Sequence, residues 1–290
     1  MNEFIHQLST GLVLGCVYAS LALALVMIHQ TTGLVNFAQG EMAMASTYLA
    51  WTLVAHGMPY WPAFALTVAL SFVAGMGIER VLIRRFDGAP AHAVIIVMIG
   101  LMILIDGLVG WIFGYDVRTV DSPFEKTAWL AAGPLSAHEA GIGLVTLLLM
   151  ALVFAFFRFT RLGLAMRAAA LTPLSSRLVG INVGLMLALG WGIAAAIGAV
   201  SGMLTAPIVY LDPNMMLNVI IYAFAGALLG GITNPWGAVV GGLAIGVAEN
   251  LAGAYLVGTD LKLVFVLAVI VAVLTIRPQG LFGRRLVTRV

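Results

Sequence analysis

Nine long apolar segments follow one another along this chain of 290 residues, and they constrain its fold more than any other feature. Only 9% of the residues are charged, against roughly 25% in soluble domains, which is too few to cover a water-facing surface. A backbone in lipid must form its own hydrogen bonds, in helices or in a closed barrel, and these segments lack the two-residue alternation of barrel strands. We therefore expect an all-α, polytopic transmembrane helical bundle. The segments are 8–28, 35–55, 61–78, 91–113, 140–157, 183–210, 217–233, 236–256 and 261–276.

The number of spans is eight or nine, because only Thr233, Asn234 and Pro235 separate the seventh segment from the eighth. These two segments either cross separately, form a re-entrant pair near 233–236, or make one broken span. The longest connections have about 25 residues, too few for an enzyme domain, so we expect a single transmembrane domain over 1–290. Residues 1–10 contain no Lys or Arg, so the first segment is expected to be an uncleaved span and not a signal peptide.

The arginines predict the orientation. All but one of them lie in three places: Arg80, Arg84 and Arg85; Arg158, Arg161, Arg167 and Arg177; and Arg277, Arg284, Arg285 and Arg289. By the positive-inside rule the 79–90 and 158–182 connections and the C-terminal tail are cytoplasmic. The 114–139 connection has four acidic residues, Glu125 among them, against Arg118 and Lys126, and suits the outside. With nine spans these assignments agree, and they place the N-terminus outside and the C-terminus inside.

Several classes of function lack their sequence signals. Cys16 is the only cysteine, and the five histidines show no metal-binding spacing, so we expect no disulfide within the chain and no metal. No Gly-x-x-x-x-Gly-Lys-[Ser/Thr] phosphate loop and no Gly-x-Ser-x-Gly elbow occur. With two lysines in all, the chain has no basic tract for nucleic acid. We expect no enzymatic activity, no cofactor and no nucleic-acid partner.

Three carboxylates, Glu41, Asp106 and Glu249, lie inside apolar segments. A charged side chain at the bilayer centre costs about 2.5–3.5 kcal/mol on insertion scales, so such groups face a cavity, a partner or a neighbouring helix. Each carboxylate therefore belongs either to a translocation pathway or proton relay, or to a buried contact between helices. For Asp106 and Glu249 the sequence leaves both interpretations open.

Glu41 stands in a polar cluster at the start of the second segment. We assign Asn36, Phe37, Gln39 and Glu41 to a translocation pathway, and expect positions 36 and 40, and likewise 37 and 41, to share a helix face. Interfacial helix capping is the alternative. A second pattern is glycines four residues apart, which let helices approach closely within the chain or in a dimer: Gly198 and Gly202, Gly237 and Gly241, and Gly242 and Gly246.

The 158–182 connection predicts a short amphipathic helix, Arg161 to Leu171, which Pro173 ends. Such a helix either lies on the membrane surface or inserts into a groove on a cytoplasmic partner.

Three motifs together resemble the LivH-type permeases of branched-chain amino acid importers. The first is GLVNFAQGEM, from Gly33 to Met42, and the second is the Arg167 to Asn182 loop with its Arg-Leu-Val-Gly-Ile-Asn end. The third is Leu229-Gly230-Gly231-Ile232 with Gly237 to Gly242, followed by Arg277 to Gly283 near the C-terminus. Two departures stand out: relatives usually have an acidic or amide residue within the stretch 171–176, and many have histidine at the position of Gln39.

The resemblance implies a pore-forming subunit in the bacterial inner membrane, of the ABC importer permease type. It would pair with a second, related permease, with two cytoplasmic ATPase subunits that bind ATP, and with a periplasmic substrate-binding protein. The 158–182 connection would then be a coupling loop that enters a groove on the ATPase, with Arg167, Pro173, Arg177 and Gly180 as its coupling residues. The N-terminus would be periplasmic, with lipid around the spans.

Branched-chain amino acids are the first expected substrate, other amino acids the second and urea or short amides the third. The main rival is a proton-coupled secondary transporter of small polar solutes, which would use one of the three intramembrane carboxylates.

Overall fold

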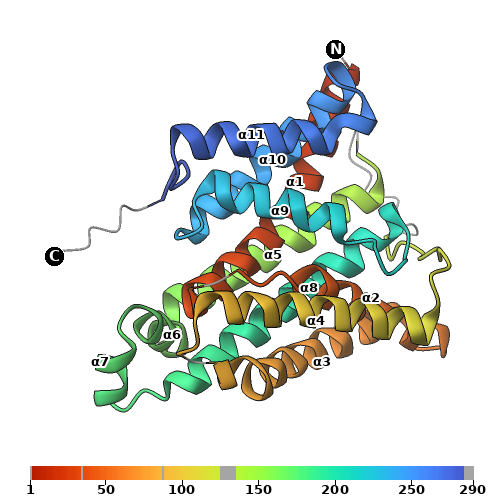
Figure 1. Cartoon of the computed structure of the whole chain (residues 1–290). Helices are drawn as coiled ribbons and strands as arrows, with labels where there is room; N and C mark the ends of the chain where they lie inside the picture. The colour runs from red at the N-terminus through yellow and green to blue at the C-terminus, as the bar shows by residue number, and fades with distance from the viewer. Residues whose placement is uncertain (1, 34, 87, 125–134, 284–290) are drawn as a thin grey trace. The chain divides into compact units, whose positions relative to one another are not determined.

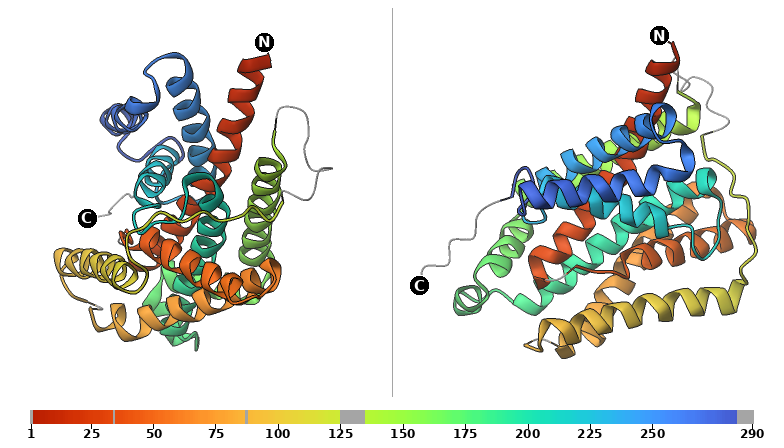
Figure 2. Two further views of the ribbon diagram at one scale, coloured as in Figure 1. Left: turned by 90° about the vertical axis from the view of Figure 1, so that its right-hand side faces the viewer. Right: turned by 45° about the horizontal axis from the view of Figure 1, so that its top comes forward.

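The computed structural model describes residues 2–33, 35–86, 88–124 and 135–283, and these are almost entirely helical. The only β contact among them is a single bridge between Arg118 and Leu211. Figures 1 and 2 show the helices in three views. The chain divides into two compact units. Unit 1 comprises Met1–Val26, Pro123–Thr146 and Asn218–Val290, and unit 2 comprises Met27–Ser122 and Leu147–Leu217.

Each of the nine apolar segments contains a helix, which confirms the predicted all-α transmembrane architecture. Seven helical stretches in the described residues are long and apolar enough to cross a membrane. They contain α1 (Asn2–Thr32), α3 (Tyr60–Val81) with η1 (Ile83–Phe86), α4 (Ala91–Phe113), α5 (Ala137–Phe159), α8 (Val183–Val209), α10 (Pro235–Tyr255), and η3 (Thr259–Leu261) with α11 (Lys262–Ile276). The chain is thus a multi-pass membrane protein.

Two apolar helices are shorter, α2 (Gln39–Ala55) and α9 (Leu217–Gly230). The 14 residues of α9 rise about 21 Å at 1.5 Å per residue, which is short of a hydrocarbon core of about 30 Å. After Gly230 the chain turns, and Asn234 caps α10 by accepting a hydrogen bond from the Trp236 N–H at 3.1 Å. The chain therefore breaks near 233–236, as the sequence predicts, and α9 and α10 form a hairpin.

Unit 2 is built around α8, which packs against α2, α3 and α6 (Arg161–Leu171) (Figure 1). Small residues allow these close contacts. A Cβ atom at Gly75 of α3 would lie 2.7 Å from the Trp191 carbonyl oxygen on α8, and one at Gly192 would lie 2.9 Å from the Phe72 carbonyl oxygen on α3. Trp191 is fully buried at this contact.

Unit 1 holds the α9–α10 hairpin, the first part of α1, and α11, of which only Val266 is buried. The segment after α11 returns to the hairpin: the Leu281 N–H donates to the Leu229 carbonyl at 2.8 Å, and the Phe282 N–H donates to the Gly230 carbonyl at 3.0 Å. The two halves of the third sequence motif, far apart in the chain, therefore lie together.

Candidate functional site

The polar cluster after α1 forms a turn followed by a helix. Gly33 leaves α1 with a φ of +72°, a conformation that glycine adopts without strain. The Asn36 side chain then accepts a hydrogen bond from the Ala38 N–H at 3.0 Å, and α2 begins only at Gln39. The expectation that positions 36 and 40, and 37 and 41, share a helix face is therefore wrong, because Asn36 and Phe37 precede the helix.

Asn36 and Gln39 form a buried amide pair that holds the start of α2 against α8. The Asn36 Nδ2 donates to the Gln39 Oε1 at 3.4 Å, and the Gln39 Nε2 donates to the Ala194 carbonyl on α8 at 2.9 Å. A Cβ atom at Gly198 would lie 2.7 Å from the Gln39 Nε2, so the glycine leaves room for this amide. Phe37 is separate from the pair, with 41% of its surface exposed.

Glu41, in the first turn of α2, lies near Asp106 of α4. Tyr48 follows Glu41 by seven residues, and Phe113 follows Asp106 by seven. The rings of Tyr48 and Phe113 stack with centroids 4.7 Å apart. Because seven residues bring a helix back to nearly the same face, Glu41 and Asp106 lie on the faces through which α2 and α4 meet. The two carboxyl groups lie near enough to each other to interact electrostatically. Glu41 is 5% exposed, and its Oε2 and the Asp106 Oδ1 are buried without a hydrogen-bond partner in the described part of the chain.

Glu249, the third intramembrane carboxylate, lies in unit 1 and is fully paired. Its Oε1 lies 3.2 Å from the Lys262 Nζ, and its Oε2 accepts a hydrogen bond from the Tyr18 hydroxyl at 3.0 Å. Asn250 continues the network, because its Nδ2 donates to the carbonyl oxygen of Gln7 at 2.7 Å. Of the two interpretations of Glu249, the structure favours a contact between helices, here joining α1, α10 and α11.

The six predicted packing glycines all lie against other parts of the same chain. In unit 2, Gly198 and Gly202 of α8 face Gln39, Ala43 and Thr47 of α2. In unit 1, Gly237 and Gly241 face Gly230 and Gly226 of α9, and Gly242 and Gly246 face Ala19 and Gly15 of α1. At each of the six, a Cβ atom would approach a neighbouring atom to 2.7 Å or less, so these glycines set how closely the helices approach one another.

The 158–182 connection forms two short helices, α6 and α7 (Pro173–Leu178), at the end of unit 2 where α8 begins (Figure 2). Thr160 caps α6 by accepting a hydrogen bond from the Gly163 N–H at 3.0 Å, and Pro173 starts α7. The predicted helix bounds, Arg161 to Leu171, are confirmed. Gly180, with a φ of +83°, ends α7: its N–H donates to the Arg177 carbonyl and the Ile181 N–H donates to the Ser176 carbonyl, a Schellman motif.

The buried face of α6 packs on its own chain. Met166 and Ala169 form a cluster with Val183 and Met186 of α8, and Phe156 and Phe157 of α5 pack against it. The apolar face of α6 is therefore buried against α8 and α5 of the same chain, and not against a membrane surface. Arg167, Pro173, Arg177 and Gly180 are all exposed.

Glu79 and Arg84 form a contact that the sequence analysis missed. Arg84 donates from Nη2 to the Glu79 Oε2 at 2.6 Å and to the Gly184 carbonyl at 2.6 Å, and Glu79 is buried. The pair therefore ties the end of α3 to the first turn of α8, directly after α7. A signal was present, because an acidic residue five positions before an arginine at a span end invites pairing. Arg84 entered the prediction only as one of the positive charges that assign the 79–90 connection to the cytoplasm.

Part of the predicted features falls outside the described residues, namely Glu125, Lys126, Arg284, Arg285 and Arg289. Within the described residues, no group of three His, Cys, Asp or Glu side chains could hold a metal ion.

Comparisons with known proteins agree with the sequence resemblance. The profile of a family described as "Branched-chain amino acid transport system / permease component" matches residues 7–274. The high-affinity branched-chain amino acid transport system permease protein LivH of Salmonella typhimurium is 32% identical over 99% of this chain and 98% of its own length. The corresponding BraD permease protein of Pseudomonas aeruginosa is also 32% identical, with the same coverage. A probable LivH permease protein of Methanocaldococcus jannaschii is 28% identical over 91% of this chain and 87% of its own length.

Proposed function

The chain belongs to the family of permease components of branched-chain amino acid transport systems, and on this premise we propose that it is the conducting subunit of an ATP-driven importer of branched-chain amino acids. Its location would be the bacterial inner membrane, with the N-terminus periplasmic and the C-terminus cytoplasmic. A second related permease, two ATPase subunits and a periplasmic binding protein would complete the importer. ATP would bind only to the ATPase subunits, because the sequence has no phosphate loop.

One observation in the structure carries the coupling part of the proposal: an exposed apolar surface on and beside α7. Its members are between 76% and 89% exposed: Leu171, Leu174, Leu178 and Val179. Arg167 and Arg177 flank this surface, and both are exposed as well. Apolar patches rimmed by polar groups mark protein interfaces, and the adjacent arginines favour the cytoplasmic side for this patch. An ATPase that binds here would bias the permease between states only if it binds them differently.

The coupling surface connects to the transmembrane helices through α8, which in turn is joined to α3. The buried face of α6 packs on α8, and Arg84 joins α3 to the first turn of α8. In the proposed importer, a displacement of α6 and α7 is passed to α8, and α8 holds the start of α2 through Gln39. The pathway residues Asn36, Gln39 and Glu41 are thus mechanically joined to the coupling loop.

The test combines assembly with transport. A tagged chain is purified in mild detergent from its native membranes, and leucine uptake is measured with and without ATP in the same membranes. Arg177→Glu is expected to lower both ATPase recovery and uptake by about tenfold or more, which is about 1.4 kcal/mol or more of binding free energy. Arg158→Glu, an equal charge reversal at the end of α5, is the matched control and keeps both. Equal behaviour of the two variants would contradict the coupling surface.

The Glu41–Asp106 pair keeps a proton-coupled transporter as the second candidate. Two neighbouring carboxyl groups, each with a buried oxygen that has no partner in the described residues, resemble the intramembrane acidic sites that carry protons in such proteins. Two results together would support this alternative. Uptake would be driven by a proton gradient in the absence of any ATPase, and the Glu41→Gln variant would lose that uptake. ATP-dependent uptake that survives dissipation of the gradient excludes it.

A further inference from the structure

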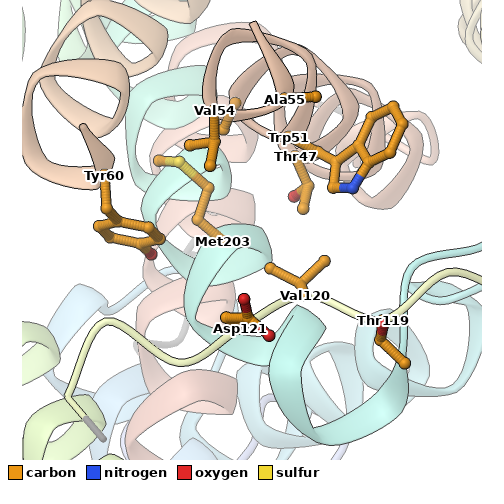
Figure 3. Close-up of a pocket in the computed structure, with 10 residues that line it drawn as sticks. Thr47, Trp51, Val54, Ala55, Tyr60, Thr119, Val120, Asp121 and Met203 are labelled. Carbon is orange, nitrogen blue, oxygen red and sulfur yellow. The ribbon is translucent and has the colours of Figure 1, made fainter. Parts of the chain in front are cut away.

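A cavity of about 150 Å³ opens beside the last turns of α2 in unit 2, and no part of the proposed function uses it. Its lining comes from four places in the chain. Figure 3 shows Thr47, Trp51 and Val54 of α2, Tyr60 of α3, Met203 of α8, and Asp121 from the segment that follows α4. That segment belongs to the 114–139 connection, which the positive-inside rule predicts to lie on the outer side of the membrane.

The cavity is apolar at its base and open at its rim. Thr47, Ala50 and Met203 are buried, and Ala50 and Met203 belong to one hydrophobic cluster with Ala199. Val54 and Asp121 are exposed. An engineered cavity of about 150 Å³ in another protein binds benzene, so a space of this size admits a four-carbon branched side chain.

The polar groups of the lining favour a cation at the rim. Asp121 is the only charged side chain that lines the described cavity. The Tyr60 hydroxyl is buried and has no hydrogen-bond partner within the described residues, and Figure 3 shows it directed toward the cavity. By contrast, the Thr47 hydroxyl is engaged, since it donates to the Ala43 carbonyl at 2.8 Å. A ligand with an ammonium group could meet both the Asp121 carboxylate and the unused Tyr60 hydroxyl.

Arg118 holds the outer wall of the cavity in place. Its backbone N–H and carbonyl both pair with Leu211, each at 2.9 Å, and its Nη2 donates to the Phe113 carbonyl at 2.6 Å. The guanidinium also lies 4.4 Å from the centroid of the Trp51 ring. The segment 119–121 therefore starts from a fixed point, and a preorganised wall lowers the entropic cost of binding.

We infer that this cavity is an acceptance site for aliphatic α-amino acids, with the branched side chain on the apolar base and the ammonium group between Asp121 and Tyr60. The inference rests on the proposed function for its substrate class and for the side of the membrane. It adds a solute contact on the permease itself, at the face to which a binding protein would deliver its ligand.

The test uses the single cysteine of the chain as an advantage. Cys16 is buried, so a cysteine introduced at the rim dominates labelling by a membrane-impermeant thiol reagent. Thr119→Cys places a thiol on the cavity wall, and Val117→Cys, two residues earlier and outside the lining, is the matched control. Labelling rates are measured on full-length protein in native membranes, without ATP, during a titration with leucine. Parallel titrations use 4-methylpentanoate, which lacks the amino group, and isobutyramide, a neutral amide.

Leucine is expected to slow the labelling of Thr119→Cys by a factor of 1 + [L]/Kd, which is about elevenfold at ten times the Kd, while Val117→Cys labels at an unchanged rate. Adding Asp121→Asn to Thr119→Cys should abolish this protection while basal labelling persists, and the two analogues should not protect. Protection by 4-methylpentanoate or isobutyramide equal to that by leucine would overturn the assignment of the ammonium site, and so would protection that survives Asp121→Asn. Absence of any leucine protection would overturn the site itself.

Failure of the inference differs from failure of the proposed function. The labelling assay contains no ATP, whereas the uptake assay depends on ATP. ATP-driven leucine uptake without protection at Thr119→Cys would leave the importer standing and remove the acceptance site.

Discussion

Removal of Lys262 should destabilise the protein strongly, and removal of its partner as well should restore most of the loss. The Lys262 Nζ lies 3.2 Å from the Glu249 Oε1, and the two side chains are 20% and 5% exposed. The aliphatic part of Lys262 packs against Gly253, one turn after Glu249 on α10, so the ammonium group is directed at the carboxylate. In Lys262→Met the carboxylate stays buried with only the Tyr18 hydroxyl as partner.

The expected loss follows from this burial. Removing one partner of a buried ion pair costs about 3–5 kcal/mol, and the partial exposure of Lys262 favours the lower end, about 3 kcal/mol. In the double variant Lys262→Met with Glu249→Gln no buried charge is left unpaired, and the glutamine can still accept the Tyr18 hydrogen bond. Replacing both members of a buried pair by neutral groups is often neutral or stabilising. The double variant should therefore lie within about 1 kcal/mol of the wild type, a coupling of about 2 kcal/mol or more.

The measurement is equilibrium unfolding of the purified chain in mixed micelles of a mild detergent and dodecyl sulfate, followed by tryptophan fluorescence. Val264→Met, an exposed position on the same helix, introduces the same side chain without touching the pair and should leave the unfolding free energy unchanged. Losses that simply add in the double variant would refute the reasoning. Leucine uptake by the double variant also separates structure from transport: wild-type uptake shows that Glu249 carries no proton in the cycle.

Two further outcomes follow from the packing of unit 2. Gly202→Val should cost about 1–3 kcal/mol of unfolding free energy, because a Cβ atom there would lie 2.7 Å from the Ala43 carbonyl oxygen. Gly77→Val should cost far less in the same unfolding assay, because nothing lies within 4 Å of a Cβ atom at Gly77. Arg84→Lys replaces a guanidinium bound to both Glu79 and the Gly184 carbonyl by a single ammonium group, and should cost about 1.5–3 kcal/mol and lower ATP-driven uptake. Arg85→Lys, at an exposed position beside it, keeps the same charge and should preserve both stability and uptake. Equal losses in either matched pair would contradict the contact concerned.

The helical architecture could be predicted from the sequence because the signals for it are local. Length and apolar composition identify a span without any knowledge of its neighbours. Thr160, Pro173 and Gly180 likewise lie next to the helices that they start or end. The start of α2 was predicted wrongly for a local reason as well. The Asn36 side chain binds the Ala38 N–H and offers the backbone a turn in place of a first helical turn.

The glycine pattern shows how far spacing alone can go. Four-residue spacing predicts a close approach, and both Gly198 with Gly202 and Gly242 with Gly246 make one. Spacing carries no information about the partner, which is α2 in the first case and α1 in the second. The close approach of Gly198 to the Gln39 amide further joins two features, the polar cluster and the packing glycine, that the sequence presents as unrelated.

Glu41 and Glu249 illustrate why the candidate site could not be chosen from the sequence. Both are single carboxylates in apolar segments, so a membrane-insertion scale that assigns a free energy to each residue type gives them the same cost. They differ in what the fold brings to them. Glu249 meets an ammonium group from the next helix and a hydroxyl group from residue 18, so its charge is neutralised within unit 1. Glu41 meets a second carboxyl group, Asp106, and keeps an oxygen without a partner in the described residues. Two carboxyl groups close together in apolar surroundings do not stabilise a membrane protein, so the α2–α4 contact is the first place to test for transport chemistry.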